Sequence, residues 1–160
     1  MKYLVTISLL LLSMTTSYSQ KKIAGNYVYK TECMGVELDG SYTLKAWGNG
    51  RNRSDAVDQA KKNAVRDVVF NNILEGKQDC ARKPLITEVN AQDKYEDYFN
   101  KFFTDGGEYL NFISLKDERI GEKLNRDRKK ARESVTNGLI VRVLRSELKT
   151  KLIADGIIKL

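Results

Sequence analysis

The segment from Ser41 to Phe70, SYTLKAWGNGRNRSDAVDQAKKNAVRDVVF, constrains the fold more than any other part of the sequence. In its first part Tyr42, Leu44 and Ala46 alternate with residues for the opposite face, which predicts a strand with one buried side. A Gly-x-Gly turn follows, and after it apolar residues recur at helical spacing. The segment therefore predicts a strand that turns sharply into an amphipathic helix.

The predicted helix runs from about Asp55 to Leu74, with Ser54 and Asp55 offering side-chain oxygens to the free N–H groups of its first turn. Gly76 is a plausible stop for this helix. Its apolar residues fall within one third of the circumference, and its charged residues lie elsewhere. The apolar set is Ala56, Val57, Ala60, Ala64 and Val68, and the charged set is Asp58, Lys62 and Arg66.

The glycines of the turn, Gly48 and Gly50, do not form a nucleotide-binding motif. Neither Gly-x-Gly-x-x-Gly nor the Lys-Ser/Thr ending of a P-loop is present. The glycines are better explained by the unusual backbone angles of a strand that turns a corner. Arg51 and Arg53 lie beside the helix start, where they either grip a small anion or are simply solvated.

Further elements follow from hydrophobic periodicity and turn residues. Tyr95, Tyr98, Phe99, Phe102 and Phe103 recur at helical spacing, which predicts a helix whose aromatic stripe packs in the core or borders a ligand groove. The predicted strands are 23–33, Leu85–Val89, Tyr109–Asp117 and Ser134–Leu144, of which the last two pair as a hairpin with a long connection. A last helix is predicted at Arg145–Ala154.

Together these elements predict an α+β fold. We expect an antiparallel sheet of three to five strands packed on a long alanine-rich helix, with the aromatic and C-terminal helices completing the core. The length left after residue 20 suits one domain, residues 21–160.

Residues 1–20 have the layout of a secretory signal peptide: Lys2, an apolar run from Leu4 to Met14, and small polar residues after it. An uncleaved anchor is the alternative, but the run is shorter than the roughly 20 residues of a spanning helix. No later apolar run approaches that length, so no transmembrane segment is expected after cleavage. We expect an exported protein, periplasmic or associated with the outer membrane.

Cys33 and Cys80 are the only cysteines. In an exported protein they form either one disulfide or two buried thiols that never meet. The chain contains no histidine, and two distant cysteines do not supply a zinc site. No metal and no cofactor are expected.

The formal charge of +7 favours contact with an acidic envelope surface or an acidic protein. The basic residues are densest in RDRKKAR, within the predicted hairpin connection; they are Arg126, Arg128, Lys129, Lys130 and Arg132. This stretch is either a binding surface for acidic groups or a solvated loop. No aromatic residues are interleaved with it, so nucleic acid is not an expected partner.

Catalytic machinery is hard to assemble from this sequence. The absence of histidine excludes Ser-His-Asp and Cys-His arrangements. The carboxylate pairs Glu96 with Asp97 and Glu37 with Asp39 sit in no recognisable catalytic frame, and we interpret them as surface groups. A histidine-free hydrolase would need a buried lysine or carboxylate with a shifted pKa.

The run LKAWGNGRNRSDAVDQAKKNAVRDVV resembles the strand, glycine turn and alanine-containing helix of envelope domains related to LPP-type outer-membrane lipoproteins and to the N-terminal domain of the flagellar assembly protein FlgT. The matching positions are Gly48, Gly50, Ala56, Ala60 and Ala64. The closing segment Leu144–Ile158 is similar too, as is the overall layout to uncharacterised exported proteins of Bacteroidetes-type bacteria. The lipid-anchoring cysteine of the lipoproteins is missing here. The resemblance implies a non-enzymatic envelope component with a small sheet packed on helices.

We therefore expect a non-enzymatic cell-envelope protein with a binding or assembly role, acting through the basic connection. The alternative is a periplasmic module that binds a small anion or a lipid near Arg51 and Arg53. A dry pocket lined by Trp47 and the aromatic stripe would favour this alternative. A histidine-free hydrolase is the least favoured function.

Overall fold

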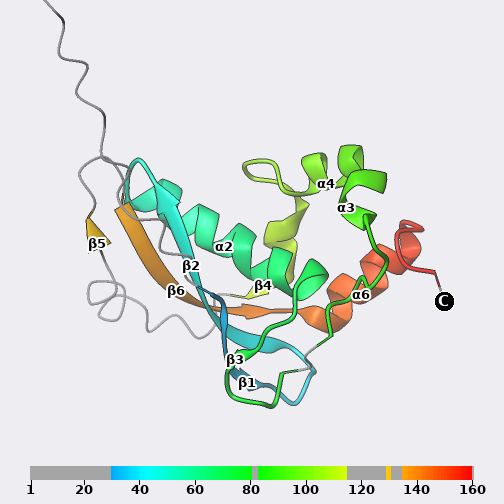
Figure 1. The fold of residues 1–160 in the computed structure, drawn as a ribbon, viewed down its shortest axis with the longest axis horizontal. Coiled ribbons are helices and arrows are strands. Elements are labelled where there is room, and N and C mark those ends of the chain that lie inside the picture. The colour runs from blue at the N-terminus through cyan, green and yellow to red at the C-terminus, as the bar shows by residue number, and fades with distance from the viewer. Residues whose placement is uncertain (1–29, 81–82, 115–128, 131–134, 160) are drawn as a thin grey trace, which may run out of the picture.

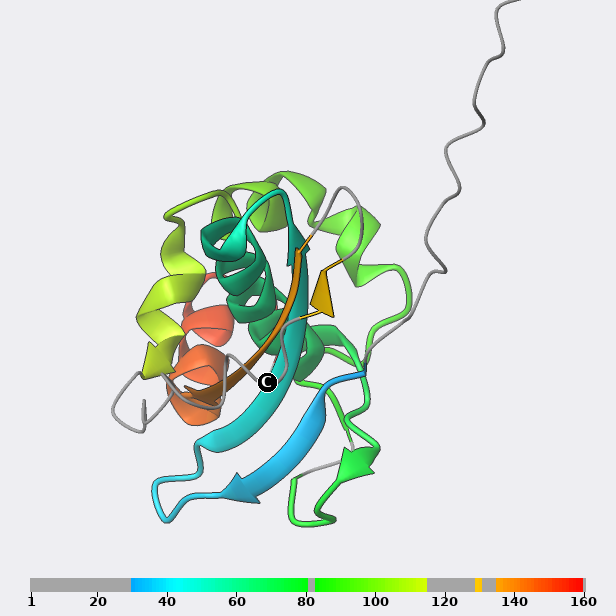
Figure 2. The same cartoon turned by 90° about the vertical axis from the view of Figure 1, so that its left-hand side faces the viewer.

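The computed structural model describes residues 30–80, 83–114, 129–130 and 135–159. The chain has an α+β fold in which helix α2 (Arg53–Phe70) lies across one face of a mixed sheet (Figures 1 and 2). The fold class predicted from the sequence is therefore confirmed. The expected signal peptide lies outside the described residues.

The sheet is built around two nine-residue strands, β2 (Tyr42–Gly50) and β6 (Val135–Val143), which pair antiparallel along their full length. The strand order is β3-β1-β2-β6-β4, and β5 pairs with β6 beside this path. The shorter strands are β1 (Glu32–Val36), β3 (Glu75–Gly76), β4 (Ile113–Ser114) and β5 (Lys129–Lys130). The antiparallel prediction fails at one place, because β3 runs parallel to β1. The first strand was predicted at 23–33, whereas β1 begins at Glu32 and continues to Val36. Residues 23–29 lie outside the described part of the chain.

Alternation along β2 produces the buried face that the sequence predicts. Tyr42, Leu44 and Ala46 are buried toward α2, and Gly48 continues this face. A Cβ atom at Gly48 would lie 2.2 Å from the carbonyl oxygen of Ala56, so only glycine permits this approach of strand and helix. The glycine turn thus serves packing as well as chain direction.

Both ends of α2 differ from the prediction. The helix begins at Arg53 because Asn52 is its N-cap: the Asn52 side chain accepts a hydrogen bond from the Asp55 N–H at 3.0 Å. Ser54 and Asp55 therefore lie inside the helix. The helix ends at Phe70 rather than Leu74, because the backbone becomes extended at Asn71.

The remaining helices are α3 (Ala91–Lys94), α4 (Glu96–Phe102), the 3-10 helix η1 (Glu108–Phe112) and α6 (Arg145–Ala154). The bounds of α6 are those predicted. The strand predicted at Tyr109–Asp117 is wrong in its first part, which forms η1 with Tyr109 and Phe112 buried. Only β4 retains the predicted antiparallel pairing with β6, and 115–117 lie outside the described residues.

The strand predicted at Leu85–Val89 is also wrong. The N–H groups of Leu85 and Ile86 donate to the carbonyl oxygens of Val68 and Val69, at 3.0 and 2.9 Å. These carbonyl groups belong to the last turn of α2, where carbonyl oxygens have no hydrogen-bond partner within the helix. The segment therefore closes the C-terminal end of α2 instead of joining the sheet.

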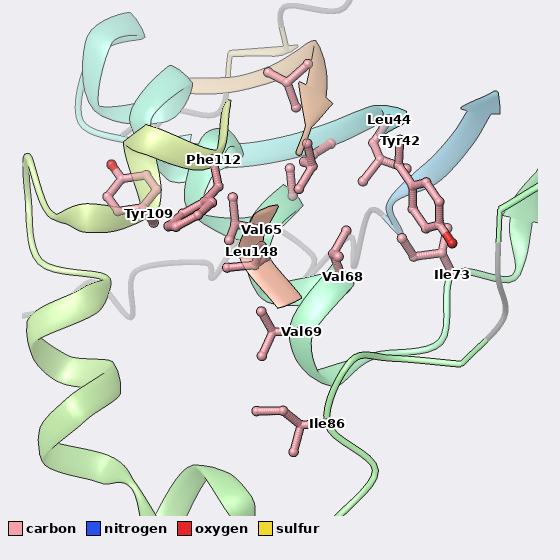
Figure 3. Packing of buried hydrophobic residues seen from close by; sticks show 14 of the residues in the cluster. Tyr42, Leu44, Val65, Val68, Val69, Ile73, Ile86, Tyr109, Phe112 and Leu148 are labelled. Carbon is pink, nitrogen blue, oxygen red and sulfur yellow. The ribbon is translucent and has the colours of Figure 1, made fainter. Parts of the chain in front are cut away.

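The core lies between the sheet, α2 and α6 (Figure 3). Val65 and Val69 from α2 meet Leu148 from α6, and Phe112 from η1 joins them. The bridge between Cys33 and Cys80 is present, with 6.0 Å between the Cα atoms, and it ties the link after α2 to the edge of the sheet. This settles the alternative that the spacing of the cysteines left open. Within the described ranges no helix is long and apolar enough to cross a membrane.

Candidate ligand-binding groove

A groove of about 370 Å³ lies between α2 on one side and α3 and α4 on the other. We call it the α2–α4 groove. Its volume falls within the range of small-molecule sites in proteins, roughly 300 to 1,000 Å³. The lining residues from α2 are Gln59, Lys62, Asn63, Arg66 and Phe70, and those from the opposite side are Gln92, Asp93, Glu96, Phe99, Asn100 and Phe103.

The apolar part of the groove is made of three phenylalanines that also pack on the core. Phe70 meets Phe99 edge to face, with 4.7 Å between ring centroids, and Phe99 stacks on Phe103 at 6.2 Å. Phe99 is buried, while Phe70 and Phe103 are half-buried. Such fixed rings present apolar area to a ligand at little cost in side-chain entropy. The predicted aromatic stripe thus serves the core and borders the groove at once.

Two polar contacts hold the walls of the groove together. Arg66 donates from Nη2 to Oε1 of Gln92 at 3.2 Å, which joins α2 to α3. Lys62 donates to Asp105, just beyond α4, at 2.5 Å, and this hydrogen bond lowers the pKa of the Asp105 carboxyl group. The Lys62 ammonium also lies 5.8 Å from the ring centre of the buried Tyr109. The groove is therefore braced at two points rather than left open between separate helices.

A side-chain relay connects the groove to the sheet. Gln59 donates to Oδ1 of Asn63 at 2.9 Å, and Asn63 donates to the backbone carbonyl of Trp47 at 2.7 Å. Both ends of the Asn63 amide are therefore engaged. The relay fixes the polar wall of α2 against β2.

Charge is distributed unevenly between the two walls. α2 contributes the cations Lys62 and Arg66, and the opposite wall contributes the carboxylates Asp93 and Glu96. Among the described residues neither carboxylate forms an ion pair or a side-chain hydrogen bond. The cations contact Asp105 and Gln92 instead. Opposite charges thus face the same groove without neutralising each other directly.

A second hollow of about 330 Å³ adjoins the groove, and the two share Phe70, Gln92 and Asp93. Its other lining residues are Ile86, Glu88, Asn90 and Ala91. Glu88 is paired with Lys94 at 2.6 Å. The hollow extends the groove past the C-terminal end of α2.

Arg51 and Arg53, the predicted anion-binding pair, do not line this groove. Arg51 precedes α2 and is almost fully exposed, at 94%, and its Nε atom lies 3.7 Å from Oδ2 of Asp55 in the first turn of the helix. Arg53 is exposed at the first position of α2. The Asn52 cap already occupies a free N–H group of the helix start.

The described residues do not form a pocket lined by Trp47 and the aromatic stripe, which is the feature that would favour an anion- or lipid-binding module. Trp47 alternates with Leu44 and Ala46 along β2 and so points to the sheet face opposite α2, where the Lys45 ammonium lies 4.7 Å from its ring centre. The aromatic stripe lies on the α2 side. The tryptophan and the stripe are therefore separated by the sheet.

Of the predicted basic surface, Arg126, Arg128 and Arg132 lie outside the described residues. The backbone of Lys129 and Lys130 forms β5, which pairs antiparallel with Val135 and Thr136 at the start of β6. Among the side chains that the structure describes, no three metal-ligating residues come together.

Lys62 and Arg66 are not among the binding residues predicted from the sequence, where they were noted only as charged residues away from the apolar stripe of the helix. A second pattern was available. Along one face of the helix, residues recur at three- and four-residue spacing: Gln59, Lys62, Asn63, Arg66 and Phe70. The first four are polar, and the last is aromatic. That pattern indicates a polar helix face that meets a partner, but it does not identify the partner as α3 and α4.

A scan against protein-family models found no match for this chain, and neither a curated protein nor a solved structure matches it. The resemblance to LPP-type lipoproteins and to the FlgT N-terminal domain therefore stays a prediction.

Proposed function

We propose that this chain is an exported, non-enzymatic binding protein of the cell envelope that takes a small ligand in the α2–α4 groove. The observation that carries the proposal is the groove itself: fixed aromatic rings, a braced polar wall, and two carboxylates, Asp93 and Glu96, that form no ion pair among the described residues. Proteins bind small molecules in concave sites that combine aromatic rings with placed polar groups, and this groove is mostly polar, with eight polar residues and three phenylalanines. The signal-peptide pattern and the cysteine pair support export.

The absence of histidine in the sequence supports a binding role over catalysis. The shifted pKa values near the groove have simple causes. The pKa of Asp105 is lowered by its hydrogen bond with Lys62, and that of Tyr109 is raised by burial. The described residues that line the groove include no serine, threonine or cysteine.

A groove-filling substitution tests the proposal. Asn100 is exposed on α4 and lines the groove, so Asn100→Trp should fill it without disturbing the core. Asn111→Trp, at an exposed position of η1 outside the groove, is the matched control. Backbone amide NMR spectra are recorded with four probes: a free tripeptide, maltotriose, dodecanoate and inorganic phosphate.

We expect at least one probe to shift the resonances of groove residues in the wild type and in Asn111→Trp, and not in Asn100→Trp. If no probe shifts them, the groove is not a ligand site. If phosphate shifts only Arg51 and Arg53, the site belongs to the helix start instead.

A second candidate function is assembly through the basic connection. It is supported by the surplus of positive charge and by the pairing of β5, at Lys129 and Lys130, with β6. Its test is a pull-down from solubilised envelope with the five cations from Arg126 to Arg132 changed to serine. Loss of a stoichiometric partner in this variant would support assembly, and identical results for both proteins would contradict it.

A further inference from the structure

We infer that the ligand of the α2–α4 groove is a short peptide with free ends and apolar side chains. This inference rests on the proposed function and names its ligand class. It follows from three features of the groove taken together: separated charges, side-chain amides and phenylalanine rings.

The separated charges select among ligand classes. A carboxylate ligand is attracted by Lys62 and Arg66 but faces Asp93 and Glu96 across the groove. A cationic ligand is attracted by Asp93 and Glu96 but faces Lys62 and Arg66. A molecule with one charge of each sign satisfies both walls, because its carboxylate lies toward α2 and its ammonium toward α3 and α4. The unpaired state of both carboxylates within the described chain leaves them available for this contact.

The cations retain donors for such a contact. Lys62 has three N–H donors and Arg66 has five, and each gives one to the contact that braces the groove. A ligand carboxylate can therefore be held while the bracing contacts stay intact. A preformed wall of this kind reduces the ordering cost of binding.

The uncharged lining matches the middle of a peptide. The Asn100 carboxamide forms no side-chain hydrogen bond among the described residues, and it offers one acceptor and two donors, as a peptide group requires. Phe70, Phe99 and Phe103 supply apolar area for side chains. A saccharide would use the amides and rings but leave the charges unmatched, and a fatty acid would bring only a negative charge.

The adjoining hollow gives the groove room for more than one residue. It continues the groove at Phe70 and adds Ile86 and Ala91 as apolar lining, with Asp93 shared between the two spaces. Its charged lining residues are Glu88, which is already paired with Lys94, and Asp93, which forms no ion pair among the described residues. The amino terminus of the peptide therefore lies toward the hollow, and its carboxylate lies toward Lys62 and Arg66.

The test uses the tripeptide leucyl-phenylalanyl-leucine in three forms: with free ends, with an acetylated amino terminus, and with an amidated carboxyl terminus. Affinities are measured by NMR titration on the full-length chain as purified from expressing cells. We expect each blocked end to weaken binding by up to about fivefold, as for the loss of one solvent-accessible ion pair.

Charge variants then assign each end to a wall. Glu96→Gln should weaken the free tripeptide but not the acetylated one, because both changes remove the same interaction. Arg66→Gln should weaken the free tripeptide but not the amidated one. Arg66→Gln also removes the hydrogen bond to Gln92 of α3. If this loosens α3, Lys62→Gln tests the same interaction with the ligand carboxylate. Glu147→Gln and Lys149→Gln, at exposed positions of α6, are the matched controls.

Equal weakening of free and blocked peptides by the groove variants would overturn the inference, as would unchanged affinity on blocking either end. Shifts of groove resonances by maltotriose or dodecanoate, but not by the tripeptide, would refute the peptide class and leave the proposed binding function standing. No shift of groove resonances with the tripeptide, maltotriose, dodecanoate or phosphate would refute both.

Discussion

Removal of the Cys33–Cys80 disulfide should lower the free energy of unfolding by about 4 kcal/mol, by the loop-entropy relation for a closed loop of this size. The two cysteines are 47 residues apart, and the bridge spans β1, β2 and the whole of α2. Cross-linking so long a segment restricts the unfolded chain far more than the folded one. Most of the effect therefore comes from the unfolded state.

The assay is urea unfolding of the oxidised protein, of the reduced protein, and of the Cys33→Ala/Cys80→Ala double variant. With a denaturant slope of about 1 to 3 kcal/mol per molar urea, the midpoint should fall by roughly 1.3 to 4 M. The slope itself should rise on reduction, because the unlinked unfolded chain exposes more surface.

The double variant is also the control, since reductant should not change its midpoint. A loss of less than 1 kcal/mol in the reduced protein, with an unchanged slope, would refute the reasoning. Such a result would mean that the segment from β1 to the link after α2 is already restricted in the unfolded chain.

Three further predictions concern single positions. Gly48→Ala should destabilise the fold by about 1 to 3 kcal/mol, because the new methyl group meets the Ala56 carbonyl oxygen at 2.2 Å; thermal unfolding measures this. Asn137 is fully buried on β6 and its amide has no hydrogen-bond partner among the described residues, so Asn137→Leu should raise stability by about 1 to 3 kcal/mol in chemical denaturation. The pKa of Asp155 is lowered chiefly by its hydrogen bond with Lys151. This carboxylate therefore contributes stability above its unfolded pKa, near 3.8, and loses it as pH falls through the folded value. Asp155→Asn should flatten the fall of melting temperature below pH 4.

Each of these predictions has a matched control and a contrary result. Asn49→Ala, on the same strand, removes only an exposed hydrogen bond from Thr136 and should lower the melting temperature much less than Gly48→Ala; equal effects at 48 and 49 would argue against the close approach of helix and strand. Asn137→Asp should destabilise strongly through a buried charge; a destabilising Asn137→Leu would contradict the prediction. Asp97→Asn should retain the wild-type acid profile.

The local sequence pattern was sufficient to predict those elements whose apolar residues follow a single strand or helix periodicity. The alternation of Tyr42, Leu44 and Ala46 predicts β2, and the bounds of α6 follow from a pair of leucines four residues apart with Gly156 beyond them. The pattern failed where the backbone N–H groups of a segment form hydrogen bonds with a distant element instead of with a neighbouring strand. Leu85 and Ile86 look like a strand, but the free carbonyls of α2 accept their N–H groups.

The sequence by itself determined the α+β class and the amphipathic helix after the glycine turn. It also showed that the chain has two cysteines and no histidine. The tertiary structure decided that those cysteines pair and that Trp47 and the aromatic stripe lie on opposite sides of the sheet. It also decided the candidate site, since Lys62 and Glu96 are 34 positions apart and periodicity reports only which face of each helix is apolar. Which polar faces meet depends on how α3 and α4 pack against α2, and no local pattern specifies that packing.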